Sequence, residues 1–253
     1  MHLFYTPDIQ QCKEMPAEES HHAIKVLRRK EGDEVLLCDG LGNFYRAVIA
    51  VASQKKCSVN IIETLPAPKH WTGQIAIAVA PTKHMDRMEW FAEKATEVGV
   101  DTFFFLNCNN SERHVLKEER IEKVVVSAMK QSHKATKPQV VPLLDFKHFI
   151  RQPFHGQKFI AHCYSQADIK GDTIATPHHI AQELSEEKPL LNKVVSPTTD
   201  TLVLIGPEGD FSIEEVRQAI QAGFIPISLG KSRLRTETAA LMAVHMMLLA
   251  KQK

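Results

Sequence analysis

From residue 74 onward, the sequence alternates between short, almost wholly apolar runs and longer segments whose apolar residues recur at helical spacing. The runs at residues 74–80 (QIAIAVA) and 201–205 (TLVLI) have almost no polar face. Strands that are apolar on both faces are typical of a parallel sheet with helices packed on each side. Residues 74–253 are therefore predicted to form a domain of the α/β class.

The order of elements in this domain follows from the same pattern. Strands are expected at residues 74–80, 102–106, 158–161, 201–205 and 224–229, and helices at residues 85–98, 117–131, 212–222 and 236–251. Ser212 and Glu215 have the spacing of a capping box at the start of the third helix. Residues 164–200 are expected to form a polar excursion with room for one helix. The last helix is apolar nearly all round, so it lies either deep in the domain or in a subunit interface.

Residues 1–68 have a different pattern and are predicted to form a separate, smaller domain. Strand-like runs occupy residues 33–38, 44–51 and 57–62, and a helical pattern occupies residues 18–29. One short helix among several short strands suggests a small barrel. Residues 65–73 (LPAPKHWTG) break every periodicity and are the candidate linker between the two domains.

Composition excludes several classes of protein. The five cysteines are widely spaced without a C-x-x-C pair, which argues against a disulfide framework or a zinc ribbon and fits a reducing compartment. The first twenty residues carry prolines and charges instead of an apolar signal core, and no run reaches the length of a membrane span, so a cytoplasmic protein is expected. The sequence contains no H-E-x-x-H motif, so no metal site is expected, and no dinucleotide, triphosphate or nucleophile-elbow motif.

Charge by itself does not identify a nucleic-acid partner, because the formal net charge is only +1. Local basic clusters at residues 25–30, 130–137 and 231–235 could contact RNA. Each of these clusters is more simply interpreted as a solvated helix face or loop. The question stays open on charge alone.

Two glycine-containing loops follow buried strands in the last third of the sequence. They are residues 206–212 (GPEGDFS) and residues 229–240 (LGKSRLRTETAA). In open α/β sheets, ligands bind beyond the carboxyl ends of the strands, where both loops are expected. Gly206, Gly209 and Gly230 allow close approach of the backbone to a ligand or a positive φ. Either loop alone could simply turn the chain, but the pair predicts a ligand site.

The two loops resemble those of the RsmE family of ribosomal RNA methyltransferases, within the SPOUT (α/β-knot) superfamily. The family patterns are close to G-P-E-G-G-[FW]-[ST]-x-x-E and L-G-x-x-I-L-R-x-E-T-A. The resemblance extends to residues 22–28 (HAIKVLR), 83–100 (KHMDRMEWFAEKATEVGV) and 111–113 (SER). Five motifs in the order of the family make the resemblance specific. The sequence departs from the family at Asp210, where the family has glycine, and in residues 130–134.

The resemblance implies a fold, a cofactor and a reaction. The implied fold is a PUA-like RNA-binding β-barrel at residues 1–68 and a SPOUT methyltransferase domain with a trefoil knot at residues 74–253, forming a homodimer through the knotted domains. The implied cofactor is S-adenosyl-L-methionine. The implied reaction is methylation of uracil N3 at one position of 16S rRNA in the small ribosomal subunit, without a metal.

The resemblance also implies roles for individual residues. Arg235 is expected to stabilise the negative charge that develops on the uracil ring, and Glu237 to orient Arg235 or to accept the proton. These two residues could instead form a capped, ion-paired helix start. Cofactor binding is expected from Leu204, Gly206, Gly209, Leu229, Gly230, Ser232 and Leu234, and RNA binding from Arg28, Arg29, Arg113 and Lys134.

Two other functions remain open from the sequence. The first is a SPOUT methyltransferase that acts on another RNA target, either a ribose 2′-hydroxyl or transfer RNA. The second is a non-enzymatic RNA-binding assembly factor, which would not bind S-adenosylmethionine.

Overall fold

The computed structural model describes residues 2–165, 168–169 and 188–252. The chain divides into two compact units, one formed by Met1–His70 with Val125–Lys137 and the other by Trp71–Val124 with Pro138–Lys253. The two domains expected at residues 1–68 and 74–253 stay a prediction as far as their boundaries are concerned. The sequence did not indicate that residues 125–137 group with the first unit.

The first unit contains a four-stranded sheet with the strand order β1-β2-β3-β4. Its elements are β1 (Leu3–Tyr5), α1 (Ile9–Cys12), α2 (Ala17–His21), the π-helix η1 (His22–Val26), β2 (Glu34–Cys38), β3 (Asn43–Val51) and β4 (Ser58–Pro66). The strand β1 runs parallel to β2, and the other neighbours are antiparallel. Phe4, Leu37 and Tyr45 are almost fully buried in the core of this unit.

The barrel expected for the first unit stays a prediction: the described strands form one four-stranded sheet, and Met15 N–H and Val59 N–H add hydrogen bonds between residues 13–15 and the start of β4. Two other expectations for this unit need correction. The helix expected at residues 18–29 ends at Val26, and Arg28 then adopts a positive φ of 54°. The expected linker begins too early, because β4 continues to Pro66, which an edge strand tolerates.

The second unit contains a six-stranded sheet with the order β10-β8-β9-β5-β6-β7, in which every pair of neighbours is parallel. The strands are β5 (Ile75–Val79), β6 (Thr102–Asn107), β7 (Gln139–Asp145), β8 (Gln157–Ala161), β9 (Thr201–Ile205) and β10 (Ile225–Ile227). All residues of β5 and β9 are buried. The predicted parallel sheet is confirmed.

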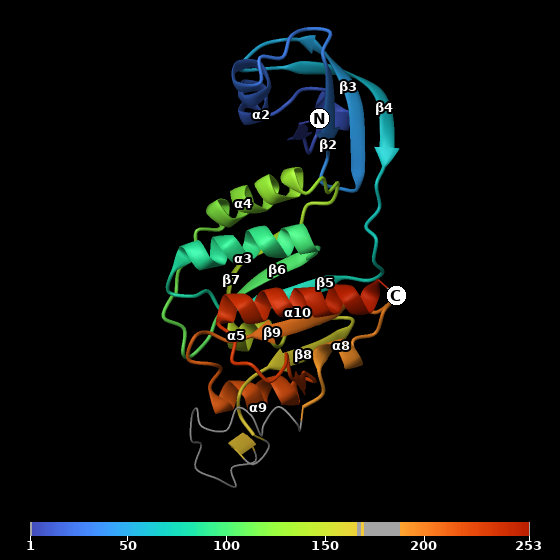
Figure 1. Ribbon diagram of the computed structural model, residues 1–253. Coiled ribbons are helices and arrows are strands. Elements are labelled where there is room, and N and C mark those ends of the chain that lie inside the picture. Colours follow the sequence, from blue (N-terminus) through green and yellow to red (C-terminus); the bar gives the residue numbers. More distant parts are fainter. Residues whose placement is uncertain (1, 166–167, 170–187, 253) are drawn as a thin grey trace. The chain divides into compact units, whose positions relative to one another are not determined.

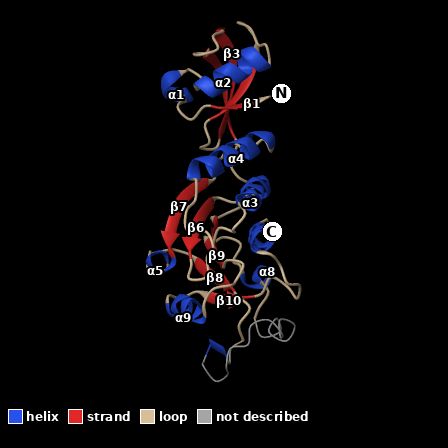
Figure 2. Cartoon of the chain, turned by 90° about the vertical axis from the view of Figure 1, so that its left-hand side faces the viewer, coloured by secondary structure: helices blue, strands red, loops and turns tan. Residues whose placement is uncertain are grey.

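Helices cover both faces of this sheet (Figure 2). The helices are α3 (Met85–Val98), α5 (Phe146–Phe149), α8 (Leu191–Val194), α9 (Ile213–Gln221) and α10 (Thr236–Lys251), and α4 (Glu118–Gln131) is divided between the two units. On one face α10 packs beside α3, with contacts to α8, β5 and β9 (Figure 1). On the other face α5 contacts α9, β6 and β7. The predicted capping box of Ser212 and Glu215 is present at the start of α9.

The strand β7 was not predicted, because Pro142 interrupts its apolar run. In the structure β7 is the edge strand, and its register with β6 shifts at this position: Phe104 pairs with Val141, and Phe105 pairs with Leu143. Pro142 therefore lies at an irregularity, where its missing N–H does not interrupt the ladder.

The helix α10 is only partly covered within the described chain. Ala240, Val244 and Met247 are buried on the side that faces the sheet and α3. On the opposite side Met246 is half-buried, and Leu249 is 49% exposed. No helix among the described residues is long and apolar enough to cross a membrane.

Candidate functional site

The carboxyl ends of the central strands bring together loops that are far apart in the sequence. The chain runs outward from β5 through β6 to β7 and then returns to β8, and β9 enters between β8 and β5. Such a reversal of strand order is where open parallel sheets bind ligands. The loops after β8 and β9 are neighbours at this edge, and the loop after β10 lies on the far side of β8.

The loop after β9 is tied to the loops after β5 and β6. The Glu208 carboxylate accepts a hydrogen bond from Lys83 N–H (2.9 Å). The Asn110 side-chain amide donates to the carbonyl oxygens of Gly209 (3.3 Å) and Asp210 (3.1 Å). The predicted ligand loop is therefore held at three points by backbone and side-chain contacts.

Gly206 is explained by contacts within its own loop. A Cβ atom at this position would lie 2.9 Å from the backbone nitrogen of Phe211. Phe211 is fully buried and packs against Phe146, with 5.5 Å between the ring centroids, so it cannot move away easily. The structure gives Gly206 a role in closing the loop, and its expected contact with a cofactor remains a prediction. Leu204, also expected to contact the cofactor, is fully buried in β9.

The sequence pattern did not single out the loop after β8, residues 162–165, as part of the site. Asp210 binds it, since one carboxylate oxygen accepts a hydrogen bond from Cys163 N–H (2.8 Å) and the other from Phe211 N–H (2.7 Å). The Tyr164 hydroxyl donates to the Phe211 carbonyl oxygen (2.9 Å). Asp210 has a φ of 63°, a backbone conformation that glycine adopts more readily than residues with a side chain. Burial raises the pKa of the Asp210 carboxyl, and the two N–H donors oppose that rise.

His162 begins this loop and is only 8% exposed. Its Nδ1 atom lies 3.1 Å from the Lys188 ammonium and accepts a hydrogen bond from Tyr164 N–H (3.2 Å). With Nδ1 acting as an acceptor, the proton of the neutral ring is assigned to Nε2, which is buried and has no hydrogen-bond partner among the described residues. Burial, assisted by the positive charge of Lys188, lowers the pKa of His162 to about 3. One sequence feature could have indicated this loop, because its polar residues directly follow a predicted strand.

The loop after β10 contains the second predicted glycine site. Gly230 has a φ of 122°, and apart from its chain neighbours no described residue has an atom within 4 Å of where a Cβ atom would lie. Its N–H donates to the Ser228 hydroxyl oxygen (3.1 Å). Among the other residues expected to bind the cofactor, Gly209 and Ser232 are exposed, and Leu229 and Leu234 are half-buried.

The two predicted catalytic residues lie at the start of α10. Arg235 is the N-cap residue, is exposed and makes no side-chain capping hydrogen bond. Glu237 lies in the first turn, and only 9% of its side chain is exposed. Its Oε1 atom is 3.9 Å from Nη1 of Arg87, and its Oε2 atom is buried, with no hydrogen-bond partner in the part of the chain that the structure describes. Arg235 and Glu237 are not paired with each other by any contact among the described residues.

The residues expected to bind RNA are divided between the units. Arg28, Arg29 and Lys134 belong to the first unit, and Arg113 belongs to the second. The Arg113 guanidinium donates hydrogen bonds to the carbonyl oxygens of Thr82 (3.1 Å) and Lys83, so it braces the loop between β5 and α3.

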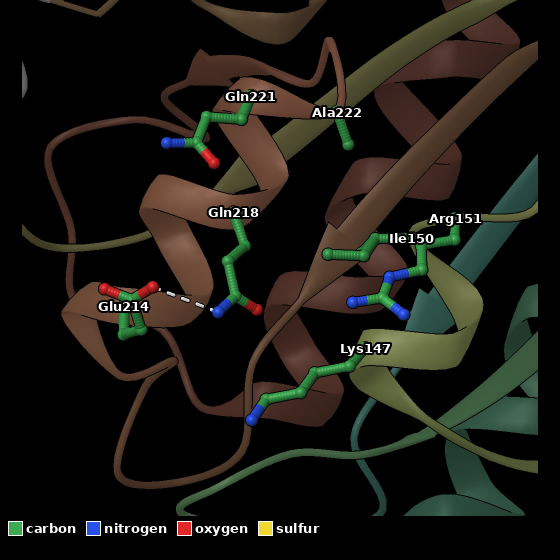
Figure 3. A pocket seen from close by; sticks show the side chains of 7 residues that line it. All are labelled: Lys147, Ile150, Arg151, Glu214, Gln218, Gln221 and Ala222. Carbon is green, nitrogen blue, oxygen red and sulfur yellow. Dashed lines mark hydrogen bonds between the residues drawn. The ribbon is translucent and has the colours of Figure 1, made fainter.

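A polar hollow of about 430 Å³ lies between α5 and α9, and none of the predicted site residues lines it (Figure 3). It is lined by Lys147, Ile150, Arg151, Glu214, Gln218, Gln221 and Ala222. Gln218 donates to Glu214 across one turn of α9 (3.0 Å). The described residues contain no group of three or more His, Cys, Asp or Glu side chains that could hold a metal ion.

Comparisons with known proteins agree in fold and in class. Residues 69–248 match the RNA methyltransferase domain family, and residues 16–62 match the RNA methyltransferase PUA domain. The ribosomal RNA small subunit methyltransferase E of Bacillus subtilis is 27% identical over 246 residues, which cover 93% of this chain and 91% of that protein.

Two solved structures are similar over nearly their whole length. A probable rRNA-methyltransferase from Porphyromonas gingivalis is 40% identical, with a TM-score of 0.82 and coverage of 96% of this chain and 95% of that one. A methyltransferase from Legionella pneumophila, solved in complex with its bound cofactor SAM, is 26% identical, with a TM-score of 0.77 and coverage of 99% and 98%.

Proposed function

This chain belongs to the RNA methyltransferase family, and from that premise we propose that it methylates the RNA of the small ribosomal subunit with S-adenosylmethionine as methyl donor. The observation that carries the proposal is that the loops after β5, β6 and β8 are hydrogen-bonded to the loop after β9 at the carboxyl edge of a parallel sheet, in a domain that matches this family. The Bacillus subtilis relative is named for the same subunit of the ribosome. The specific target that we propose is N3 of one uridine in 16S rRNA.

The residues at this edge fit S-adenosylmethionine, which has an apolar ring face, polar ribose hydroxyls and charged groups. Gly230 has open space in front of its Cα atom, and Leu229 and Leu234 offer half-buried apolar side chains. His162 Nε2 and Glu237 Oε2 are buried polar atoms without hydrogen-bond partners among residues 2–165, 168–169 and 188–252, and native structures rarely leave such atoms unsatisfied. We propose that Leu204, Gly206, Gly209, Leu229, Gly230, Ser232 and Leu234 form the cofactor site.

The chemistry assigned to the protein is proton removal and charge stabilisation. S-adenosylmethionine supplies a methyl group that its sulfonium charge activates. Glu237 accepts the proton that uracil N3 loses, and Arg235 stabilises the negative charge that is left on the ring. The exposed position of Arg235 at the N-cap of α10 leaves its guanidinium accessible to RNA, and the buried position of Glu237 strengthens its interactions.

The rest of the assignment concerns binding and assembly. We propose that a PUA domain within residues 1–68 holds RNA through Arg28 and Arg29 with Lys134, and that residues 74–253 form a SPOUT domain with a trefoil knot.

The uncovered apolar side of α10, which includes Met246 and Leu249, supports a homodimer. Light scattering that gives the mass of one chain would contradict the dimer. A ribosomal target implies a cytoplasmic enzyme, and the chemistry requires no metal.

The proposed function is tested with purified protein, methyl-labelled S-adenosylmethionine and small subunits that lack the modification. We expect calorimetry to detect cofactor binding, and nucleoside mass spectrometry to detect labelled 3-methyluridine in 16S rRNA. Label in 2′-O-methylated nucleosides or in transfer RNA would replace the proposed target. Absence of both cofactor binding and methylation would indicate an assembly factor instead of an enzyme.

A further inference from the structure

Arg87 and Glu237 come from two motifs that lie far apart in the sequence, and the fold of the second unit brings them together. Arg87 is in the first turn of α3, and Glu237 is in the first turn of α10. Each helix follows a strand of the parallel sheet, so both helices begin at its carboxyl edge, and they pack side by side (Figure 1). The pair therefore lies at the edge where the glycine loops gather.

The two carboxylate oxygens of Glu237 have different surroundings. Oε1 faces the Arg87 guanidinium at 3.9 Å, which is too long for a hydrogen bond but close enough for strong attraction at a buried site. Oε2 is enclosed, and no described residue forms a hydrogen bond with it. A buried carboxylate without a countercharge is strongly disfavoured, so Glu237 depends on a nearby cation.

Other cations around the start of α3 have different partners. Arg113 donates to the carbonyl oxygens of Thr82 and Lys83. The Lys83 ammonium pairs with Glu112 at 3.0 Å. Arg120, which lies on α4, pairs with Glu89 of α3, the helix that carries Arg87. Arg87 is thus the cation that the described contacts assign to Glu237, and one third of its side chain is exposed (34%).

We propose that Arg87 is a positioning residue for methyl transfer. It supplies the countercharge of Glu237 and draws Oε1 toward itself, which leaves Oε2 to accept the hydrogen bond, and then the proton, of the N–H group on the target base once RNA binding opens a path to this enclosed atom. This inference rests on the proposed function, because it assigns a role to Arg87 in the same reaction. Arg87 acts through Glu237 and does not contact the base in this scheme.

The test compares Arg87→Gln and Arg87→Lys with Arg120→Gln, which breaks the other arginine pair of α3 and serves as the matched control. Each variant is assayed by single-turnover methylation of small subunits, by calorimetry with S-adenosylmethionine and by thermal unfolding. Loss of assisted proton transfer lowers rates by about 100-fold or more, so we expect a fall of at least about tenfold for Arg87→Gln with cofactor affinity nearly unchanged. Arg87→Lys keeps the charge and should recover part of the rate, and Arg120→Gln should react like wild type.

A double-mutant cycle with Glu237→Gln tests whether Arg87 acts through Glu237. If it does, the double variant reacts no more slowly than Glu237→Gln alone, whereas independent roles would make the two losses add. A wild-type rate for Arg87→Gln, additive losses, or a loss of cofactor affinity as large as the loss of rate would each overturn the inference. A loss of methylation rate in Arg120→Gln as large as the loss in Arg87→Gln would also overturn the inference. If wild type itself transfers no methyl group, the proposed function fails first, and this inference fails with it.

Discussion

At the scale of single residues, His162 makes the stability of the protein depend on pH. Its pKa falls from the ordinary 6.5 to about 3 in the folded state, so between these values the unfolded state binds a proton that the folded state does not. Stability is therefore lost as the pH decreases from 6.5 toward 3, by up to about 1.4 kcal/mol per pH unit from this residue. The substitution His162→Gln should make the free energy of unfolding depend less on pH in this range.

The measurement is urea unfolding at several pH values between 7 and 3, with wild type, His162→Gln and the exposed His155→Gln as control. The prediction requires the slope of stability against pH to change for His162→Gln alone. An unchanged slope in that variant would show that His162 does not remain neutral in the folded protein.

The role of His162 could not be predicted from the sequence for a physical reason. The strand before it was predicted, but no local pattern shows that β9 enters between β8 and β5 and so places the loop after β8 next to residues 206–212. Asp210 was recognised only as a departure from the family. Its bond to Cys163 N–H became visible with the fold.

At the scale of elements, strong periodicity predicted helices and strands well, and short or interrupted segments were missed. The bounds of α3 and β9 agree with the prediction, because a long amphipathic pattern and a wholly apolar run leave few alternatives. The strand β7 was missed because of Pro142. The short α5 and α8 have four residues each, which is too few for a helical period to be recognised.

The loop after β9 supports a prediction at the same scale. Gly206→Ala would place a Cβ atom 2.9 Å from Phe211 N, and the buried Phe211 must then shift. Overpacking of this kind typically costs about 1–3 kcal/mol, and cofactor affinity should fall with it. Gly209→Ala is the matched control in the same loop, since its Cβ atom would lie 3.4 Å from Asn110 Cβ, an ordinary contact.

Urea unfolding and calorimetry with S-adenosylmethionine measure both effects of these substitutions. We expect Gly206→Ala to lose stability and affinity while Gly209→Ala stays near wild type in stability. Equal stability of the two variants would mean that the loop adjusts without strain and that Gly206 has another role.

At the scale of the whole molecule, the chain forms two units. The second half of α4 belongs to the first unit, although the sequence predicted it in the second domain. The apolar spacing of residues 117–131 is continuous, so the sequence indicates one helix in one domain. In the structure Met129 packs with Leu3 and Cys38 of the first unit, and Lys130 pairs with Glu19 there. Periodicity predicts which face of a helix is buried, but it does not indicate which unit buries it.

At this scale we propose, as the central claim, that this chain methylates small-subunit RNA with chemistry at the start of α10. The most direct measurement is nucleoside mass spectrometry of 16S rRNA from a strain that lacks the gene, complemented with wild type or with Arg235→Ala. We expect 3-methyluridine to be lost in the deletion strain and restored by wild type. With Arg235→Ala we expect the rate at which 16S rRNA is methylated to fall by about 100-fold. Undiminished 3-methyluridine in the deletion strain would contradict the claim, and restoration at the wild-type rate by Arg235→Ala would contradict the site.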